Sequence, residues 1–176
     1  ELGFKNLSKL SSKSYISSEP TNDPHCKFED LYENSEELII LTGGQNDFFG
    51  NLFKLNKVTQ LEEIIQKISK IFKDRIYIEI QRHQDRDEKN YENYIINLSR
   101  KLNLPLIASQ EIFYIKSDMH EAHDALICIG KKEFIDDKNR FKFSNHHYFK
   151  TSDELKKTFE DIPEALENNY NFPLRF

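Results

Sequence analysis

The most regular apolar pattern of the chain lies in its middle part and predicts alternating strands and helices. Compact apolar runs at 37–41, 76–80 and 106–108 predict buried strands, each followed by polar or turn-forming residues. Between the first two runs, Thr59 and Glu62 have the spacing of a capping box that opens a helix. The apolar residues of this helix fall on one face: Leu61, Ile64, Ile65, Ile68, Ile71 and Phe72.

A second amphipathic helix is predicted between the second and third strands. A charged turn at 84–88 precedes it, and its apolar face consists of Tyr91, Tyr94, Ile95, Leu98 and Leu102. Strand, helix, strand, helix and strand in this order, with short connections, predict parallel βαβ units and an α/β fold. Three parallel strands are few for a closed barrel or a complete doubly wound sheet. We therefore expect the chain to be a fragment of a larger α/β protein.

Shorter helices are expected on both sides of this centre. Apolar residues at helical intervals predict a helix over 3–16, then a turn-rich loop over 17–24 and a helical turn over 28–32. After the third strand, 118–129 is expected to be helical and a long charged loop follows. Two further helices are predicted, one capped by Thr151 and Glu154 and carrying Leu155 and Phe159, and one running from Pro163 to Tyr170.

Composition narrows the class of protein but assigns no activity. The 176 residues suit one domain and carry a formal net charge of −5. Basic clusters at 131–132 and 138–142 have acidic neighbours, which argues against this piece binding a nucleic-acid backbone alone. The sequence shows neither a signal peptide nor an apolar run approaching the ~20 residues of a membrane span. Cys26 and Cys128 lack the spacing of a disulfide or metal-binding pair. The sequence therefore predicts two reduced cysteines in a cytoplasmic protein.

Catalytic groups in parallel α/β folds are expected at the carboxyl ends of the strands. His83 follows the second strand and Glu111 the third, so both are candidate metal ligands, with Asp47 a more distant third. A hydrolytic metal centre needs several converging ligands, and we therefore favour a polar rim on the sheet. The sequence has no Gly-x-Ser-x-Gly elbow and no readable cysteine–histidine arrangement, so we assign no catalytic residue.

The other motifs favour structural roles. Thr42-Gly43-Gly44 lacks the Gly-Lys-Ser/Thr ending of a nucleotide-binding loop, and we expect a tight turn at positive φ. His120 and His123, three residues apart, could hold a metal, but a capped or packed helix end is favoured. The adjacent pair His146-His147 is interpreted as packing or surface, because neighbouring residues rarely share one ligand geometry. His25 has no partner at metal-site spacing.

Several short segments together resemble one family. They include Leu-Pro-Leu-Ile-Ala-Ser-Gln-Glu at 104–111 and Asp-Ile-Pro-Glu-Ala-Leu at 161–166, and the others are 6–10, 38–44, 77–80, 121–129 and 134–137. In this order and spacing the chain resembles, over nearly its whole length, the PHP (polymerase and histidinol phosphatase) domain of bacterial DNA polymerase III alpha subunits. The resemblance implies that 1–176 is the carboxyl-terminal portion of a distorted (β/α)7 barrel with additional C-terminal helices, truncated at both ends relative to the parent polymerase.

The resemblance also implies a degenerate metal centre. Metal-binding members of the family carry Cys where this chain has Gly44, and Asp-x-His where it has Glu111 and Phe113. His83 matches a position that is often His in those members, whereas the His-x-His motif of their first strand is absent here. We therefore expect no metal or other cofactor in this fragment, with His83 and Glu111 as remnants of the site.

By resemblance, the leading functional hypothesis is a non-catalytic scaffold of a replicative DNA polymerase. The domain would dock the proofreading exonuclease and other replicase subunits. The parent polymerase would bind DNA and use Mg²⁺ held by carboxylates outside this chain. The alternative is a metal-dependent phosphoesterase or 3′–5′ proofreading nuclease, in which upstream ligands complete His83 and Glu111. A free-standing domain that binds proteins is a third possibility.

Overall fold

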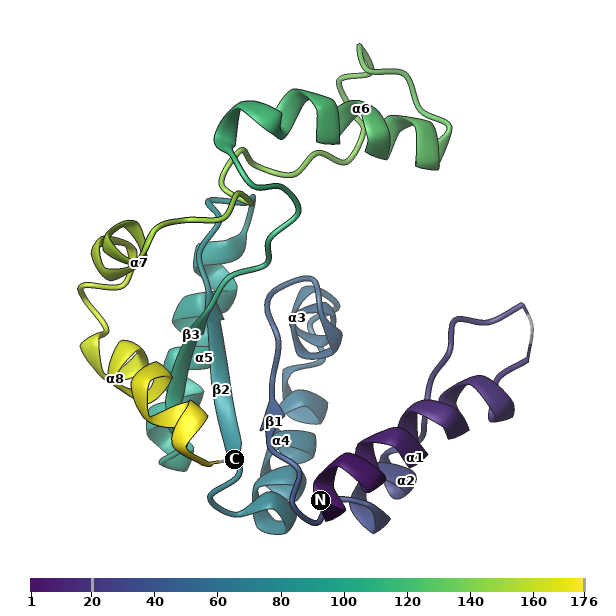
Figure 1. The fold of residues 1–176 in the computed structure, drawn as a ribbon, viewed down its shortest axis with the longest axis vertical. Helices are drawn as coiled ribbons and strands as arrows, with labels where there is room; N and C mark the ends of the chain where they lie inside the picture. The colour runs from purple at the N-terminus through teal and green to yellow at the C-terminus, as the bar shows by residue number, and fades with distance from the viewer. Residues whose placement is uncertain (20, 176) are drawn as a thin grey trace.

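The computed structural model describes residues 1–19 and 21–175. These residues form a C-shaped molecule, in which a helical arm extends from either side of an α/β centre (Figure 1). The centre holds a three-stranded parallel sheet in the order β1 (Ile40–Leu41), β2 (Ile76–Gln81) and β3 (Leu106–Ser109). The parallel βαβ order predicted from the sequence is therefore confirmed.

The pairing of the strands follows their order in the chain. Ile40 lies opposite Ile76 in the first pair, and Ile78 lies opposite Leu106 in the second. Both crossovers run through helices, as parallel strands require. The first crossover contains α3 (Phe48–Lys54) and α4 (Val58–Phe72), and the second contains α5 (Glu88–Leu102).

The first strand is shorter than the sequence predicts. Of the expected strand at 37–41, only Ile40–Leu41 pairs with β2. Glu37 has a left-handed backbone, with a φ of 56°, which interrupts an extended ladder. Its carboxylate accepts a hydrogen bond from the Gly3 amide at 3.0 Å. The residues before β1 therefore form a turn that holds the first helix.

The predicted capping box of α4 is wrong, although the helix and its apolar face are confirmed. The helix begins at Val58, and its N-cap residue is Lys57, without a side-chain cap hydrogen bond. The Leu61 amide already donates to the Lys57 carbonyl at 3.0 Å. Because this bond places Thr59 within the first turn, Thr59 and Glu62 do not take the N-cap and N3 positions of a capping box.

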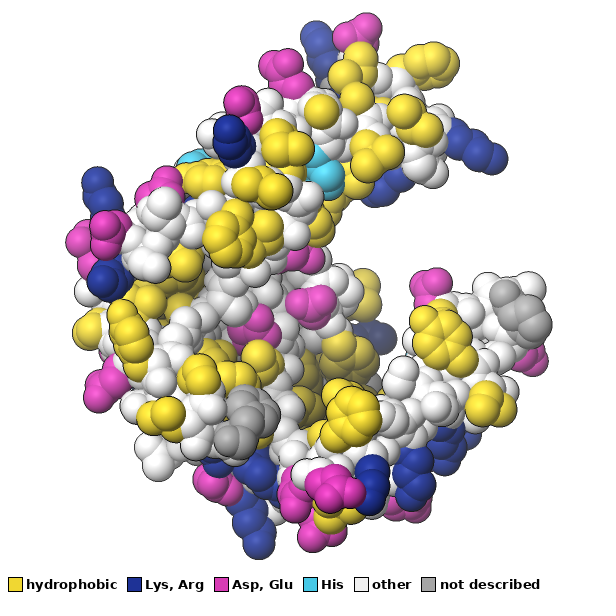
Figure 2. All heavy atoms as spheres, in the orientation of Figure 1, with side chains coloured by type: hydrophobic (Ala, Val, Ile, Leu, Met, Phe, Trp, Pro, Cys, Tyr) yellow, Lys and Arg dark blue, Asp and Glu magenta, His cyan; other side chains and the backbone are white. Residues whose placement is uncertain are grey.

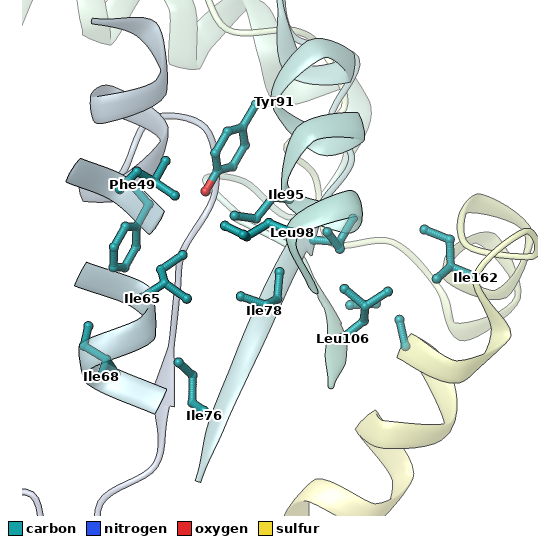
Figure 3. Close-up of a cluster of buried hydrophobic side chains, with 14 of the residues drawn as sticks. Phe49, Ile65, Ile68, Ile76, Ile78, Tyr91, Ile95, Leu98, Leu106 and Ile162 are labelled. Atoms are coloured by element: carbon teal, nitrogen blue, oxygen red, sulfur yellow. The ribbon is translucent and has the colours of Figure 1, made fainter. Parts of the chain in front are cut away.

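The hydrophobic core lies between the sheet and the helices that pack on it. Ile76, Ile78 and Ile80 alternate along β2 and are at most 1% exposed. Burial of each such side chain contributes about 1.5–3 kcal/mol. Figure 3 shows β2 and β3 between α4 and α5 on one side and the C-terminal helix on the other. Core side chains labelled there include Phe49, Ile65, Ile68, Ile76, Ile78, Ile95, Leu98, Leu106 and Ile162.

The arms consist mainly of the shorter helices predicted from the sequence. The helix expected over 118–129 is a 3₁₀ turn that leads into α6, and the capping box of Thr151 and Glu154 is confirmed. The remaining bounds are α1 (Leu2–Ser17), α2 (Phe28–Glu33), η1 (Ser117–Met119), α6 (His120–Lys131), α7 (Ser152–Thr158), α8 (Pro163–Asn171) and η2 (Phe172–Arg175).

Helix α8 covers the outer edge of β3. The side-chain amide of Asn168 donates to the Leu106 carbonyl, and that of Asn169 donates to the Ala108 carbonyl, both at 2.7 Å. These bonds satisfy carbonyls that an edge strand would otherwise expose. Within the described part of the chain β1 has a single strand neighbour, so the sheet is open on the β1 side.

Two further expectations concern the cysteines and membrane segments. Cys26 is exposed and Cys128 is buried, and both are free, as the spacing predicts. Among the described residues, none of the helices has the length and apolar character that crossing a membrane requires.

Candidate functional site

The glycine turn after β1 confirms the expected positive φ at Gly43, which is 78°. The Gly43 amide donates to Glu79 Oε2 at 3.0 Å, and the Gly44 amide donates to Asp47 Oδ2 at 2.7 Å. The Asp47 carboxylate is thus engaged in its own turn. Asp47, the acidic candidate ligand that follows the first strand, is therefore already hydrogen-bonded within this turn.

Glu79 of β2 joins all three strand ends. Besides the Gly43 amide, its carboxylate accepts hydrogen bonds from the Ser109 hydroxyl and from Gln81 Nε2, the latter at 3.1 Å. Sequence reasoning missed this residue. The available signal was a carboxylate within the apolar run 76–80, where β2 alternates between the core and its other face.

Gly44 leaves no room for a side-chain ligand in the present arrangement. A Cβ atom built there would lie 2.1 Å from Gln81 Oε1 and 2.7 Å from its Cδ. A cysteine at this position would therefore displace the Gln81 amide. The geometry agrees with the loss of a thiolate ligand that the family resemblance implies at Gly44.

His83 is buried at the end of β2, and both of its ring nitrogens have neighbours. Nε2 accepts a hydrogen bond from the Glu111 amide at 3.1 Å, and Nδ1 lies 3.4 Å from Glu88 Oε1. The His83 amide also donates to Glu88 Oε1 at 2.8 Å. The structure therefore brings the two predicted candidates, His83 and Glu111, together. The contact uses the backbone of Glu111 rather than its carboxylate.

His147 was not predicted as a ligand from the sequence. Its side chain is fully buried beside His83 and the Glu111 backbone. Its Nε2 lies 2.9 Å from Asp85 Oδ2, and its Nδ1 lies 3.3 Å from the Glu111 carbonyl oxygen. Asp85 also accepts a hydrogen bond from the Ser144 amide at 2.8 Å. Burial acts to raise the pKa of Asp85, but the hydrogen bonds from His147 and Ser144 and nearby positive charge outweigh it and lower the pKa.

His83, Asp85 and His147 form the one cluster of potential metal ligands within residues 1–19 and 21–175, with ligand atoms within 4.8 Å of one another. The two imidazoles are stacked, with centroids 4.1 Å apart and planes inclined by 6°. An imidazole nitrogen binds a metal in the plane of its ring, about 2.0–2.1 Å away for zinc. Nearly parallel planes share no such point, so this arrangement does not fit a metal held by both histidines.

Aromatic packing surrounds Phe113, the position at which the resemblance implies the histidine of Asp-x-His. The Phe113 ring stacks on His147 and on His123, with centroid distances of 4.9 and 5.0 Å. Burial lowers the pKa of His123, and His120 Nε2 lies 3.1 Å from the Phe143 carbonyl oxygen. The histidines at the start of α6 are packed against the loop, as the sequence analysis favoured.

Glu111 remains half-exposed beside this cluster. Its carboxylate lies 3.7 Å from His147 Nδ1, and burial raises its pKa against the opposing influence of the neighbouring histidines. Both histidines and Asp85 are hydrogen-bonded within the fold, and the stacked rings do not converge on one point as the ligands of a hydrolytic centre do. The cluster is best described as a buried polar clamp, consisting of His83, Asp85, Glu111 and His147.

Comparison with known proteins supports the family resemblance noted in the sequence. Residues 1–83 match the PHP domain family. The whole chain is similar to part of the proteins named DNA polymerase III subunit alpha: 38% identical in Rickettsia bellii, 33% in Caulobacter vibrioides and 30% in Vibrio cholerae, with 99% of this chain covered in each case. The resemblance inferred from the sequence is thereby confirmed. The chain spans about 15% of the length of these relatives.

Proposed function

We propose that the chain is part of a replicative DNA polymerase alpha subunit and serves there as a non-catalytic PHP scaffold and docking domain. The polar clamp is the observation that carries the proposal, because the histidines of the strand ends are stacked and hydrogen-bonded within the fold. The parent protein would catalyse templated DNA synthesis in the cytoplasm, with Mg²⁺ held by carboxylates outside this chain. This fragment would need no cofactor.

The open side of the sheet supports a larger barrel. β1 has a free edge in the described structure, whereas α8 covers the edge of β3. Native proteins normally pair or cover an exposed strand edge. We place the missing strands of a distorted (β/α)7 barrel beside β1, so that residues 1–176 form its carboxyl-terminal portion.

The arm around α6 offers the docking surface. Figure 2 shows hydrophobic side chains gathered along this arm at one end of the C shape. Apolar patches of this kind mark interaction sites when they are contiguous. We call the following residues the α6 surface, with their exposed fractions: Leu126 (64%), Ile129 (75%), Phe134 (84%) and Ile135 (54%). The partner we propose is another replicase subunit, the proofreading exonuclease.

A pair of substitutions in the full-length polymerase tests the docking surface. Ile129→Lys and Leu126→Lys should weaken binding of the exonuclease subunit at least about tenfold in calorimetric titration, because each places a charge in an apolar interface. Phe4→Lys on α1 is the matched control, since Phe4 is 76% exposed on the other arm. Unchanged exonuclease binding in both α6 variants would refute docking at this surface, and a destabilised polymerase would show that its own chain covers α6.

A further inference from the structure

A small, largely enclosed cavity lies beneath the glycine turn at the strand ends. It has a volume of about 10 Å³ and is lined by residues of the turn, of β2 and of α5. That volume is close to the minimum that holds a single water molecule. Its lining includes Gly44, Gln45, Glu79, Glu88 and Tyr91.

Two residues of this lining each have a buried polar atom without a hydrogen-bond partner in residues 1–19 and 21–175. These atoms are Gln45 Oε1 and the Tyr91 hydroxyl, on side chains that are 7% and 4% exposed. Figure 3 shows Tyr91 extending from α5 with its hydroxyl pointing into the interior. Leaving a buried polar group unpaired costs about 1–3 kcal/mol, so native proteins satisfy such groups with protein atoms or ordered water. Two unpaired groups lining one cavity of this size therefore point to a ligand.

We propose that this cavity binds one ordered water molecule, which accepts a hydrogen bond from the Tyr91 hydroxyl and donates one to Gln45 Oε1. Such a water links the turn after β1 to α5. A water molecule can donate two hydrogen bonds and accept two. The Tyr91 hydroxyl would be a donor to it, and Gln45 and Glu79 of the lining carry acceptor oxygens. The site is independent of the proposed docking function.

Water fits the cavity better than a cation. Burial, together with the charges of Asp47 and Glu79, raises the pKa of the Tyr91 hydroxyl, which therefore stays protonated and needs an acceptor. A cation offers no acceptor. The neighbouring carboxylates are already engaged: the Gly43 amide and the Ser109 hydroxyl donate to Glu79, and Arg82 pairs with Glu92.

A high-resolution crystal structure of the protein tests the site directly. We expect one density peak within ~2.7–3.2 Å of both the Tyr91 hydroxyl and Gln45 Oε1. An empty cavity would contradict the proposal. A peak ringed by oxygens at ~2.3–2.6 Å would contradict it as well, because those distances indicate a bound cation.

The direction of a thermal shift gives a second test. If the water is present, Tyr91→Phe removes a satisfied hydrogen bond and should lower the melting temperature by about 2–4 °C. If the cavity is dry, the same substitution removes an unpaired buried donor and should raise the melting temperature or leave it unchanged. Tyr94→Phe is the control, because Tyr94 lies on the same helix but its hydroxyl makes only a long 3.4 Å bond to Glu62.

A double-mutant cycle separates one shared water from two independent groups. Tyr91→Phe and Gln45→Met should be non-additive in melting temperature if one water bridges both side chains, because either substitution alone disrupts the same bridge. Additive shifts from the two substitutions would contradict the shared water.

Discussion

The α/β centre and the α6 arm are stabilised in different ways. In the centre, the core side chains of β2 and α4 are almost fully buried and their contacts are apolar. The arm leaves its α6 surface exposed and is connected to the centre through polar contacts and the stacked rings of His83 and His147. The Ser144 amide and His147, both from the loop after α6, bind Asp85 at the end of β2. The centre therefore depends on apolar packing, whereas attachment of the arm combines hydrogen bonds and charge with the stacking of His147 on His83 and Phe113.

A second polar contact organises the arm internally. Arg140 donates both terminal guanidinium nitrogens to the two carboxylate oxygens of Asp124, at 2.6 and 2.5 Å, so that the loop folds back onto α6. This hydrogen bonding lowers the pKa of Asp124. Bidentate pairs of this kind fix geometry as well as adding energy. Polar contacts thus determine the path of the loop that carries His147.

The largest expected effect is in the centre. Ile78→Ala removes a fully buried side chain of β2 and should lower the free energy of unfolding by about 2–5 kcal/mol, measured by urea denaturation. Ile64→Ala on the half-buried side of α4 is the matched control and should cost clearly less. Equal costs at the two positions would contradict the assignment of β2 to the core.

The next effect concerns the junction between the arm and the centre. His147→Ala should cost about 1–3 kcal/mol, because Asp85 and the Glu111 carbonyl lose a buried partner. Amide hydrogen exchange should rise over 133–150 while β2 stays protected. The neighbouring His146→Ala is the control, since the hydrogen bonds of His146 within the described residues use its backbone. Equal exchange in both variants would show that the clamp does not hold the arm.

The smallest effect is a dependence on acid. The pKa of Asp85 is lower in the folded protein than its ordinary value of 3.8. The contact therefore adds stability above pH 3.8 and loses it as the pH falls through the folded-state pKa. Asp85→Asn should flatten this acid dependence in denaturation curves recorded at several pH values. An identical acid slope in the variant would contradict the clamp as a charged contact.

The same contrast explains how much of the structure the sequence predicts. Helices α4 and α5 and strands β2 and β3 follow from local apolar patterns, because each packs apolar side chains into the core. Helix α1 has the predicted helical spacing, but Phe4 and Leu7 of its apolar face are exposed. Helix α3 was not predicted, since it is short and contains Gly50. A Cβ atom at Gly50 would lie 2.2 Å from the Gln45 carbonyl oxygen, so the glycine serves a close approach that no periodicity reveals.

The candidate site was only half predictable for a related reason. His83 and Glu111 were found because each follows a strand, and parallel strands end at the same edge. Asp85 and His147 were missed because their contact joins residues 62 positions apart, across a loop without regular structure. From the sequence, the adjacent pair His146-His147 is interpreted as packing or surface, and the surface alternative is wrong for His147, which is fully buried. The structure shows that His147 is also a hydrogen-bonding partner of Asp85.

The metal content of the purified full-length protein tests the central claim most directly. The account predicts that mass spectrometry finds far less than one zinc or manganese ion per chain at the strand ends, and that His83→Ala leaves the metal content unchanged. Added manganese should produce no anomalous scattering beside His83 or His147 in crystals. A stoichiometric ion that disappears in His83→Ala would contradict the scaffold and favour the metal-dependent nuclease.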